Sequence, residues 1–253
     1  MIIPALHRQV VPMDRDAHRG WRVKPLGDWR IAAQLNSAFI AAGEMIDACR
    51  EYPIVFVNAG KDEAGAPQLA PVAVFGLSAQ ENLFLDGPRW RADYMPAVLR
   101  LYPFVIGRLD AENFAVCIDS AWDGFSKTEG QPLFDAQGEM GDIAKRAVEQ
   151  LQGYEAEVQR TKLVCERFAA LGLLREMRFD LNSGDGKTFA VEGFLAVDEE
   201  KLRALPDEAV LELNRSGLLS LLHAHMISMR NIQRLAQWKF ERMAAAPAQA
   251  AND

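Results

Sequence analysis

Apolar residues recur along the chain with two different spacings, which divide it into a strand-rich first part and a helix-rich second part. Short apolar runs bounded by turn-forming residues are typical of buried strands. Such runs lie at residues 54–57, 71–77, 82–85, 101–107 and 114–118. Because short loops join them without a long intervening helix, we predict that they pair as an antiparallel meander.

The spacing becomes helical over residues 142–172. Small or apolar residues follow one another at steps of three and four, so they form one stripe along a helix. The stripe consists of Ala147, Leu151, Tyr154, Val158, Thr161, Cys165 and Phe168. Gly172 is placed to end this helix. We interpret the stripe as a face packed into the core, and a seam between two copies in a homo-oligomer is the alternative.

The rest of the chain predicts a hairpin and a second long helix. Residues 177–181 and 189–197 flank a turn rich in Gly, Asn and Asp, and a long helix follows over 217–243. The predicted fold class is therefore α+β, with an antiparallel β-sheet meander packed by two long helices in a single domain. We assign residues 1–20 to an extended N-terminal arm, 21–243 to the α+β domain and 244–253 to a disordered tail.

Composition places the chain among ordinary globular proteins, with 49% hydrophobic and 25% charged residues. The longest charge-free stretches, 31–43 and 216–229, are shorter than the roughly 20 residues that a membrane-spanning helix needs. The N-terminus lacks the apolar run of a secretion signal. Its three cysteines, Cys49, Cys117 and Cys165, show no paired spacing. We expect a cytoplasmic protein with free thiols.

The net charge of the chain limits the class of partner that it is expected to bind. A net charge of −7 disfavours nucleic acid, whose binding depends on clustered Lys and Arg. Arg89, Arg91 and Arg100 nevertheless form a local basic cluster, which leaves a small anionic ligand open. We predict a protein or peptide partner, no nucleic acid and no membrane span.

No motif for a metal, nucleotide or catalytic nucleophile is found. The glycines fit neither phosphate-binding pattern, and G-x-S-x-G is missing. His223 and His225 lie about 200° apart around a helix, so they cannot chelate one ion together. We interpret His225 as a core histidine, and Asp119 and Asp123 as turn caps. No metal and no cofactor are predicted.

The richest polar and aromatic cluster extends from residue 86 to residue 104. Arg supplies planar donors for carboxylates, while Trp and Tyr supply contact area with a polar group at the tip. We hypothesise a binding surface formed by Arg89, Trp90, Arg91, Tyr94, Arg100 and Tyr102. The alternative is an Arg–Asp network that fixes a loop onto the edge of the sheet.

A family resemblance appears in the same region. The segments are WRADYMPAVLRLYPF at 90–104, GQPLFD at 130–135, VDEEKL at 197–202 and AHMISM at 224–229. In order and spacing they resemble the bacterial SapC-like family over most of residues 20–240. The resemblance implies an accessory role, since related genes neighbour TonB-dependent receptors, halogenase-like proteins and cupin-like or JmjC-like oxygenases. Some relatives carry a peptide-permease label, which the missing membrane spans contradict.

These observations favour a cytoplasmic accessory protein that recognises a protein segment, a peptide or a small acidic ligand, in connection with TonB-dependent uptake or protein modification. One alternative is an enzyme, oxygenase-like or another peptide modifier, whose site is assembled from residues distant in sequence. Its candidate residues are Asp119, Asp123, Glu129, His223 and His225. The other alternative is a component of a surface layer.

Overall fold

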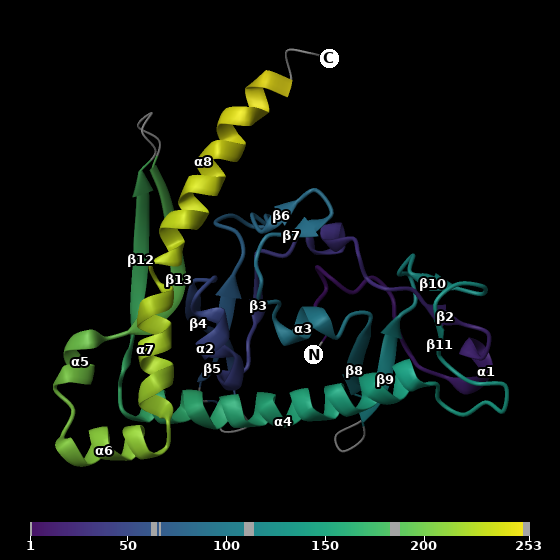
Figure 1. The fold of residues 1–253 in the computed structure, drawn as a ribbon. Helices are drawn as coiled ribbons and strands as arrows, with labels where there is room; N and C mark the ends of the chain where they lie inside the picture. The colour runs from purple at the N-terminus through teal and green to yellow at the C-terminus, as the bar shows by residue number, and fades with distance from the viewer. Residues whose placement is uncertain (1, 62–64, 66, 109–113, 183–187, 250–253) are drawn as a thin grey trace.

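The longest helix, α4 (Asp142–Ala170), extends beneath the molecule and contacts strands of three sheets (Figure 1). The computed structural model describes residues 2–61, 65, 67–108, 114–182 and 188–249. The predicted stripe is buried in the core, except for the half-buried Val158. Gly172 has a φ of +64° and donates to the Ala169 carbonyl, while Leu173 donates to that of Phe168. This Schellman motif confirms the predicted helix end.

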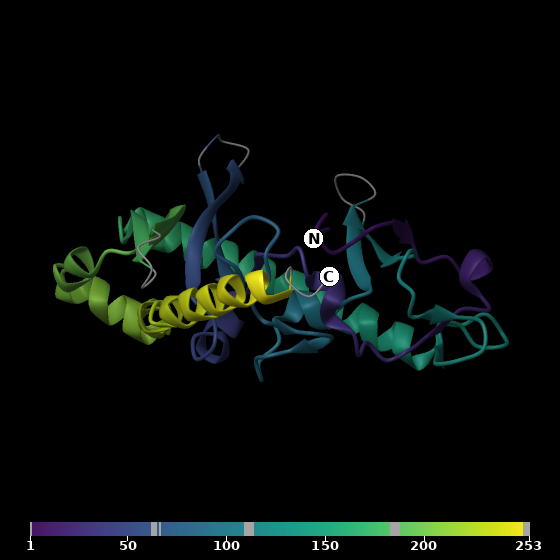
Figure 2. The ribbon, with the colours of Figure 1, turned by 90° about the horizontal axis from the view of Figure 1, so that it is seen from above.

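A five-stranded antiparallel sheet covers the C-terminal half of α4 (Figures 1 and 2). Helix α7 (Leu218–Ser228) packs against the same sheet. The ring of Phe56 contacts the Phe168 ring of α4 at 6.0 Å and the His225 ring of α7 at 5.2 Å, measured between centroids. In spatial order the strands are β12 (Leu174–Asn182), β13 (Thr188–Val197), β4 (Ile54–Lys61), β5 (Pro67–Val74) and β3 (Ser37–Phe39).

Smaller sheets stand over the N-terminal half of α4 and beside the core (Figure 1). All described strand pairs are antiparallel, which confirms the α+β class. The strands divide among separate sheets, and short helices lie at several of the connections between them. The sheets are β1 (Val10–Pro12), β9 (Phe114–Asp119) and β8 (Phe104–Arg108); β10 (Phe125–Ser126), β2 (Arg22–Val23) and β11 (Gln131–Pro132); and β6 (Leu85–Asp86) with β7 (Arg89–Trp90).

The prediction of one helix over 217–243 is wrong, because the chain forms α7 and then α8 (Asn231–Gln249). The Asn231 side chain donates to the carbonyls of Cys49 and Tyr52 at 2.9 and 3.1 Å. The Ser228 hydroxyl accepts the Ile54 N–H at 3.0 Å. These long-range bonds satisfy backbone groups ahead of and within β4, so the helix breaks where it meets them.

Other boundaries also differ from the predictions. Helix α8 includes residues 244–249 of the predicted disordered tail, while 250–253 lie outside the described residues. Of the predicted strand at 82–85, Leu85 alone lies in a strand of the described structure, and the Asn82 side chain donates to the Ala32 carbonyl and accepts the Phe84 N–H. No helix within the described ranges is long and apolar enough to cross a membrane.

The remaining helices are short. They are α1 (Arg15–His18), η1 (Trp29–Ala32), η2 (Ala42–Glu44), α2 (Met45–Ala48), α3 (Ala97–Arg100), α5 (Glu199–Arg203) and α6 (Asp207–Arg215).

Candidate functional site

Trp90, a member of the predicted binding surface, belongs mainly to the core. Its Nε1 donates to the Tyr52 hydroxyl at 2.8 Å, and its ring stacks on Phe84 with 5.8 Å between centroids. The Tyr52 hydroxyl in turn donates to the carbonyl of Tyr94. Two parts of the cluster are therefore joined by a partly buried hydrogen-bond chain.

Arg89 and Arg91 flank Trp90 and are exposed. Arg89 lies 3.5 Å from the Asp86 carboxylate in a solvent-exposed pair. The Arg91 guanidinium lies 5.0 Å from the centre of the Trp238 ring on α8. The second interaction holds the β6–β7 hairpin against α8, as a cation–π contact between two elements.

Glu44 organises the part of the cluster that contains Tyr94 and Arg100. Its Oε1 accepts the Tyr94 hydroxyl and the Ala97 N–H, each at 2.7 Å, and its Oε2 accepts the Ala41 N–H at 2.8 Å. Burial, together with the bond to Glu44, raises the pKa of Tyr94. The Arg100 guanidinium lies 5.7 Å from the centre of the Tyr94 ring. This network fixes the position of Arg100 at the C-terminal end of α3.

Tyr102 and Asp119, predicted for different sites, meet in the core. The Tyr102 hydroxyl donates to Asp119 Oδ2 at 2.9 Å, and the carboxylate also accepts the N–H groups of Arg8 and Gln9 at 3.0 and 2.8 Å. Burial raises the pKa of Asp119, but these hydrogen bonds lower it by more, so the net shift is downward. Asp119 thereby fastens the N-terminal arm to β9.

The structure does not bring the residues of the enzyme hypothesis together. His223 and His225 lie on α7, and β9 with Asp119 lies towards the opposite end of α4 (Figures 1 and 2). Asp123 is exposed, and Glu129 pairs with Lys24. Among the described residues no cluster of His, Cys, Asp and Glu could hold a metal ion.

His225 has the environment predicted for a core histidine. It is 1% exposed, and its Nε2 accepts the Val197 N–H at 3.0 Å. Its Nδ1 has no hydrogen-bond partner in the described part of the chain. Burial lowers the pKa of His225 to about 4, so the imidazole is neutral at physiological pH.

Three cationic side chains from distant parts of the sequence line one pocket of about 380 Å³ beside α4. They are Lys24, Arg100 and Arg146, and no carboxylate of a described residue lines the pocket with them. Arg146 donates to Gln131 Oε1 at 2.9 Å and, like Arg100, forms no ion pair with another described residue. Lys24 pairs with Glu129 at 2.7 Å. We call this the cationic pocket.

Buried aromatic rings complete the cationic pocket. Tyr102, Phe104 and Trp122 line it, and the rings of Tyr102 and Trp122 meet edge to face at 5.7 Å. On α4, Arg146 and Gln150 are one turn apart and present one helix face to the pocket. Guanidinium groups beside an apolar wall suit a carboxylate, because the wall reduces the competition from water.

A second pocket of about 310 Å³ adjoins the cationic pocket and shares Arg100 and Gln150 with it. We call it the tyrosine pocket, after Tyr154, whose side chain is 8% exposed and whose hydroxyl has no hydrogen-bond partner among the described residues. Burial, with the nearby charge of Glu44, raises the pKa of Tyr154. Glu157 Oε2 in the same pocket is also buried without a partner in the described chain.

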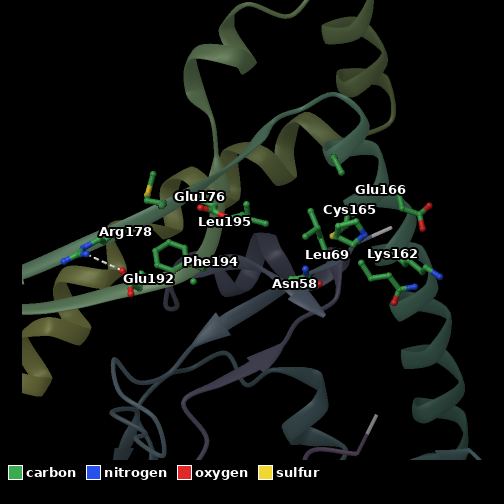
Figure 3. Close-up of a pocket in the computed structure, with 15 residues that line it drawn as sticks. Asn58, Leu69, Lys162, Cys165, Glu166, Glu176, Arg178, Glu192, Phe194 and Leu195 are labelled. Atoms are coloured by element: carbon green, nitrogen blue, oxygen red, sulfur yellow. Dashed lines mark hydrogen bonds and ion pairs between the residues drawn. The ribbon is translucent and has the colours of Figure 1, made fainter. Parts of the chain in front are cut away.

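A groove of about 930 Å³ lies between α4 and the two long hairpins (Figure 3). Among the described residues, β13 pairs with β4 at Leu195 and Phe56, and Gly193, with a φ of +86°, lies at a bulge in the outer hairpin beside the groove. Its arginine, Arg178, is paired with Asp180 and Glu192. Lys162 also lines this groove, together with three carboxylates, those of Glu166, Glu176 and Glu192. The groove is therefore less suited to an anion than the cationic pocket, which no carboxylate of a described residue lines.

The cysteine in that groove is not a candidate nucleophile. Burial raises the pKa of Cys165 to about 12, so the thiol stays protonated near neutral pH. Cys49 and Cys117 are also buried free thiols, as predicted from their spacing. The Cys165 side chain contributes to the core stripe of α4.

Sequence reasoning found Arg100 and Tyr102 and missed the other cations of the pocket. Lys24 lies in the irregular N-terminal region, where no period predicts a contact. Arg146 was detectable only in part, since it directly precedes Ala147, the first residue of the recognised apolar stripe. No local sequence pattern marked Glu44 as part of a site.

Comparison with known proteins identifies a family. The family model described as SapC matches residues 13–235. A search of curated proteins and of solved structures finds no match. The matched range includes every residue that lines the cationic and tyrosine pockets. By this match, the chain belongs to the SapC family.

Proposed function

We propose that this protein is a cytoplasmic binding protein that recognises an acidic segment of a partner protein through the cationic pocket. The observation that carries the proposal is the placement of Lys24, Arg100 and Arg146 around one pocket in a chain whose net charge is −7. An acidic protein that gathers cations at one place creates a local positive field, which attracts carboxylates.

The state of the arginines supports the same conclusion. Arg100 and Arg146 make no ion pair with a described residue, so their charge is available to a ligand. Arg100 is held in place by Tyr94 and Glu44, and a positioned donor loses less conformational entropy on binding than a mobile one. An accessory role in uptake or protein modification, which the family resemblance implies, is compatible with such a recognition site.

The test is calorimetric titration with the peptide acetyl-Glu-Glu-Glu-amide, with acetyl-Gln-Gln-Gln-amide as the uncharged control. We expect the acidic peptide alone to bind, and the affinity to fall as salt is added. The double variant Arg100→Gln/Arg146→Gln should bind roughly tenfold or more weakly, because each guanidinium forms charge-assisted hydrogen bonds.

The matched control is Arg89→Gln/Arg91→Gln, which removes the same charge from the other part of the sequence-predicted surface. It should bind the acidic peptide as the unmodified protein does. Equal affinity for the two peptides would overturn the proposal. Loss of binding only in the Arg89/Arg91 variant would move the site to the β6–β7 hairpin.

A further inference from the structure

The tyrosine pocket combines acidic side chains with buried polar atoms that have no hydrogen-bond partner among the described residues. Tyr154 is 8% exposed, yet its hydroxyl lacks a hydrogen bond within the described chain. Glu157 Oε2 is buried in the same state, and Glu44 Oε2 accepts only the Ala41 N–H. Unpaired buried acceptors are costly, so the native protein is expected to satisfy them with a bound group.

Glycine residues keep the space beside these atoms open. Gly43 lies against Glu157, since a Cβ at this position would be 3.1 Å from Oε2. Gly153 lies inside α4 and lines the pocket, and a Cβ there would meet nothing within 4 Å. Glycine in a helix interior is about 1 kcal/mol less favourable than alanine. No neighbour in the structure requires Gly153 to lack a side chain, so its only visible effect is to leave the pocket open.

The charges that line the pocket define the group that fits. Glu44 and Glu157 line the pocket together with Arg100. Arg160 pairs with Glu157 Oε1 at 3.4 Å, which leaves Glu157 Oε2 as the atom without a partner among the described residues. A primary ammonium carries one positive charge and three N–H donors. It therefore matches the carboxylate and hydroxyl oxygens that line this pocket.

We propose that the tyrosine pocket binds a primary ammonium group, such as the side chain of a lysine in a peptide partner. Glu157 and Tyr154 accept its N–H donors, and the Glu44 carboxylate adds negative charge to the pocket. That the ammonium belongs to a peptide rests on the proposed function. The tyrosine pocket adjoins the cationic pocket and shares Arg100 and Gln150 with it, so one peptide could occupy both. The partner segment then carries an acidic residue next to a lysine.

The test follows the amide signals of Gly43 and Gly153 by NMR during titration with acetyl-lysine-methylamide. Acetyl-norleucine-methylamide, which lacks the ammonium, is the control probe. We expect saturable shifts with the lysine probe alone, and roughly tenfold or greater weakening in Glu157→Gln. Equal shifts with the two probes, or no saturable shift with lysine, would overturn the assignment.

Gly153→Leu separates binding from folding. It strengthens α4 because leucine is a better helix former than glycine, and it places a side chain in the open pocket. We expect a raised melting temperature together with loss of the lysine response. Glu149→Gln, on the exposed surface of α4, should leave binding unchanged. Unaltered lysine binding in Gly153→Leu would also overturn the proposal. Because the glutamate peptide tests the other pocket, either site can fail alone.

Discussion

Burial shifts the pKa values of three tyrosines in this protein more than neighbouring charge does. The pKa values of Tyr94, Tyr102 and Tyr154 are raised, with desolvation as the largest cause in each case. Their hydroxyl groups therefore remain protonated and act in hydrogen bonds, and none of them is a base at neutral pH.

His225 makes stability depend on pH. Burial lowers its pKa from 6.5 to about 4, so the folded state keeps it neutral while the unfolded chain takes up a proton below pH 6.5. Its contribution is therefore complete above pH 6.5 and is lost as the pH falls towards 4. We expect the free energy of unfolding to fall by about 2 kcal/mol between pH 7 and pH 5 from this group.

Urea unfolding at several pH values checks this expectation. His225→Gln should reduce the slope of the free energy of unfolding against pH. His223→Gln should leave that slope unchanged, because His223 is exposed on the same helix. Some slope remains in His225→Gln, since burial also lowers the pKa of His7. A slope identical in the unmodified protein and in His225→Gln would contradict the assignment.

Among the elements, α4 was the most predictable and the α7–α8 pair the least. The stripe from Ala147 to Phe168 and the stop at Gly172 are local patterns, so the sequence alone located the helix. The break before Asn231 depends on carbonyl groups of Cys49 and Tyr52, which lie far away in the chain. No periodicity within residues 217–243 reports such contacts.

Packing of α4 on the sheet can be tested with two substitutions on the same helix. Phe168 is fully buried against Phe56, so Phe168→Ala should destabilise the fold by roughly 3–5 kcal/mol. Leu163 is 66% exposed, so Leu163→Ala should change the free energy of unfolding by less than about 0.5 kcal/mol. Thermal or urea unfolding measures both. Similar effects at the two positions would show that α4 presents a different face to the core.

At the scale of the whole molecule, helix α4 contributes residues to the cationic pocket, the tyrosine pocket and the groove. Residues of its first half line the cationic and tyrosine pockets, and residues of its last turns line the groove of Figure 3. Arg100 and Tyr102 were predictable because arginine and aromatic residues cluster in that segment. Lys24 and Arg146 reach the same pocket only through tertiary folding, so no local pattern in the sequence could have grouped them with Arg100.

The central claim is the location of the acidic-ligand site, and NMR mapping tests it most directly. Acetyl-Glu-Glu-Glu-amide is titrated into the isotope-labelled protein, and the amide and arginine Nε signals are followed. Our account predicts saturable shifts centred on Lys24, Arg100 and Arg146. Shifts centred on Arg89 and Arg91, on the groove of Figure 3, or nowhere at saturating peptide would contradict it.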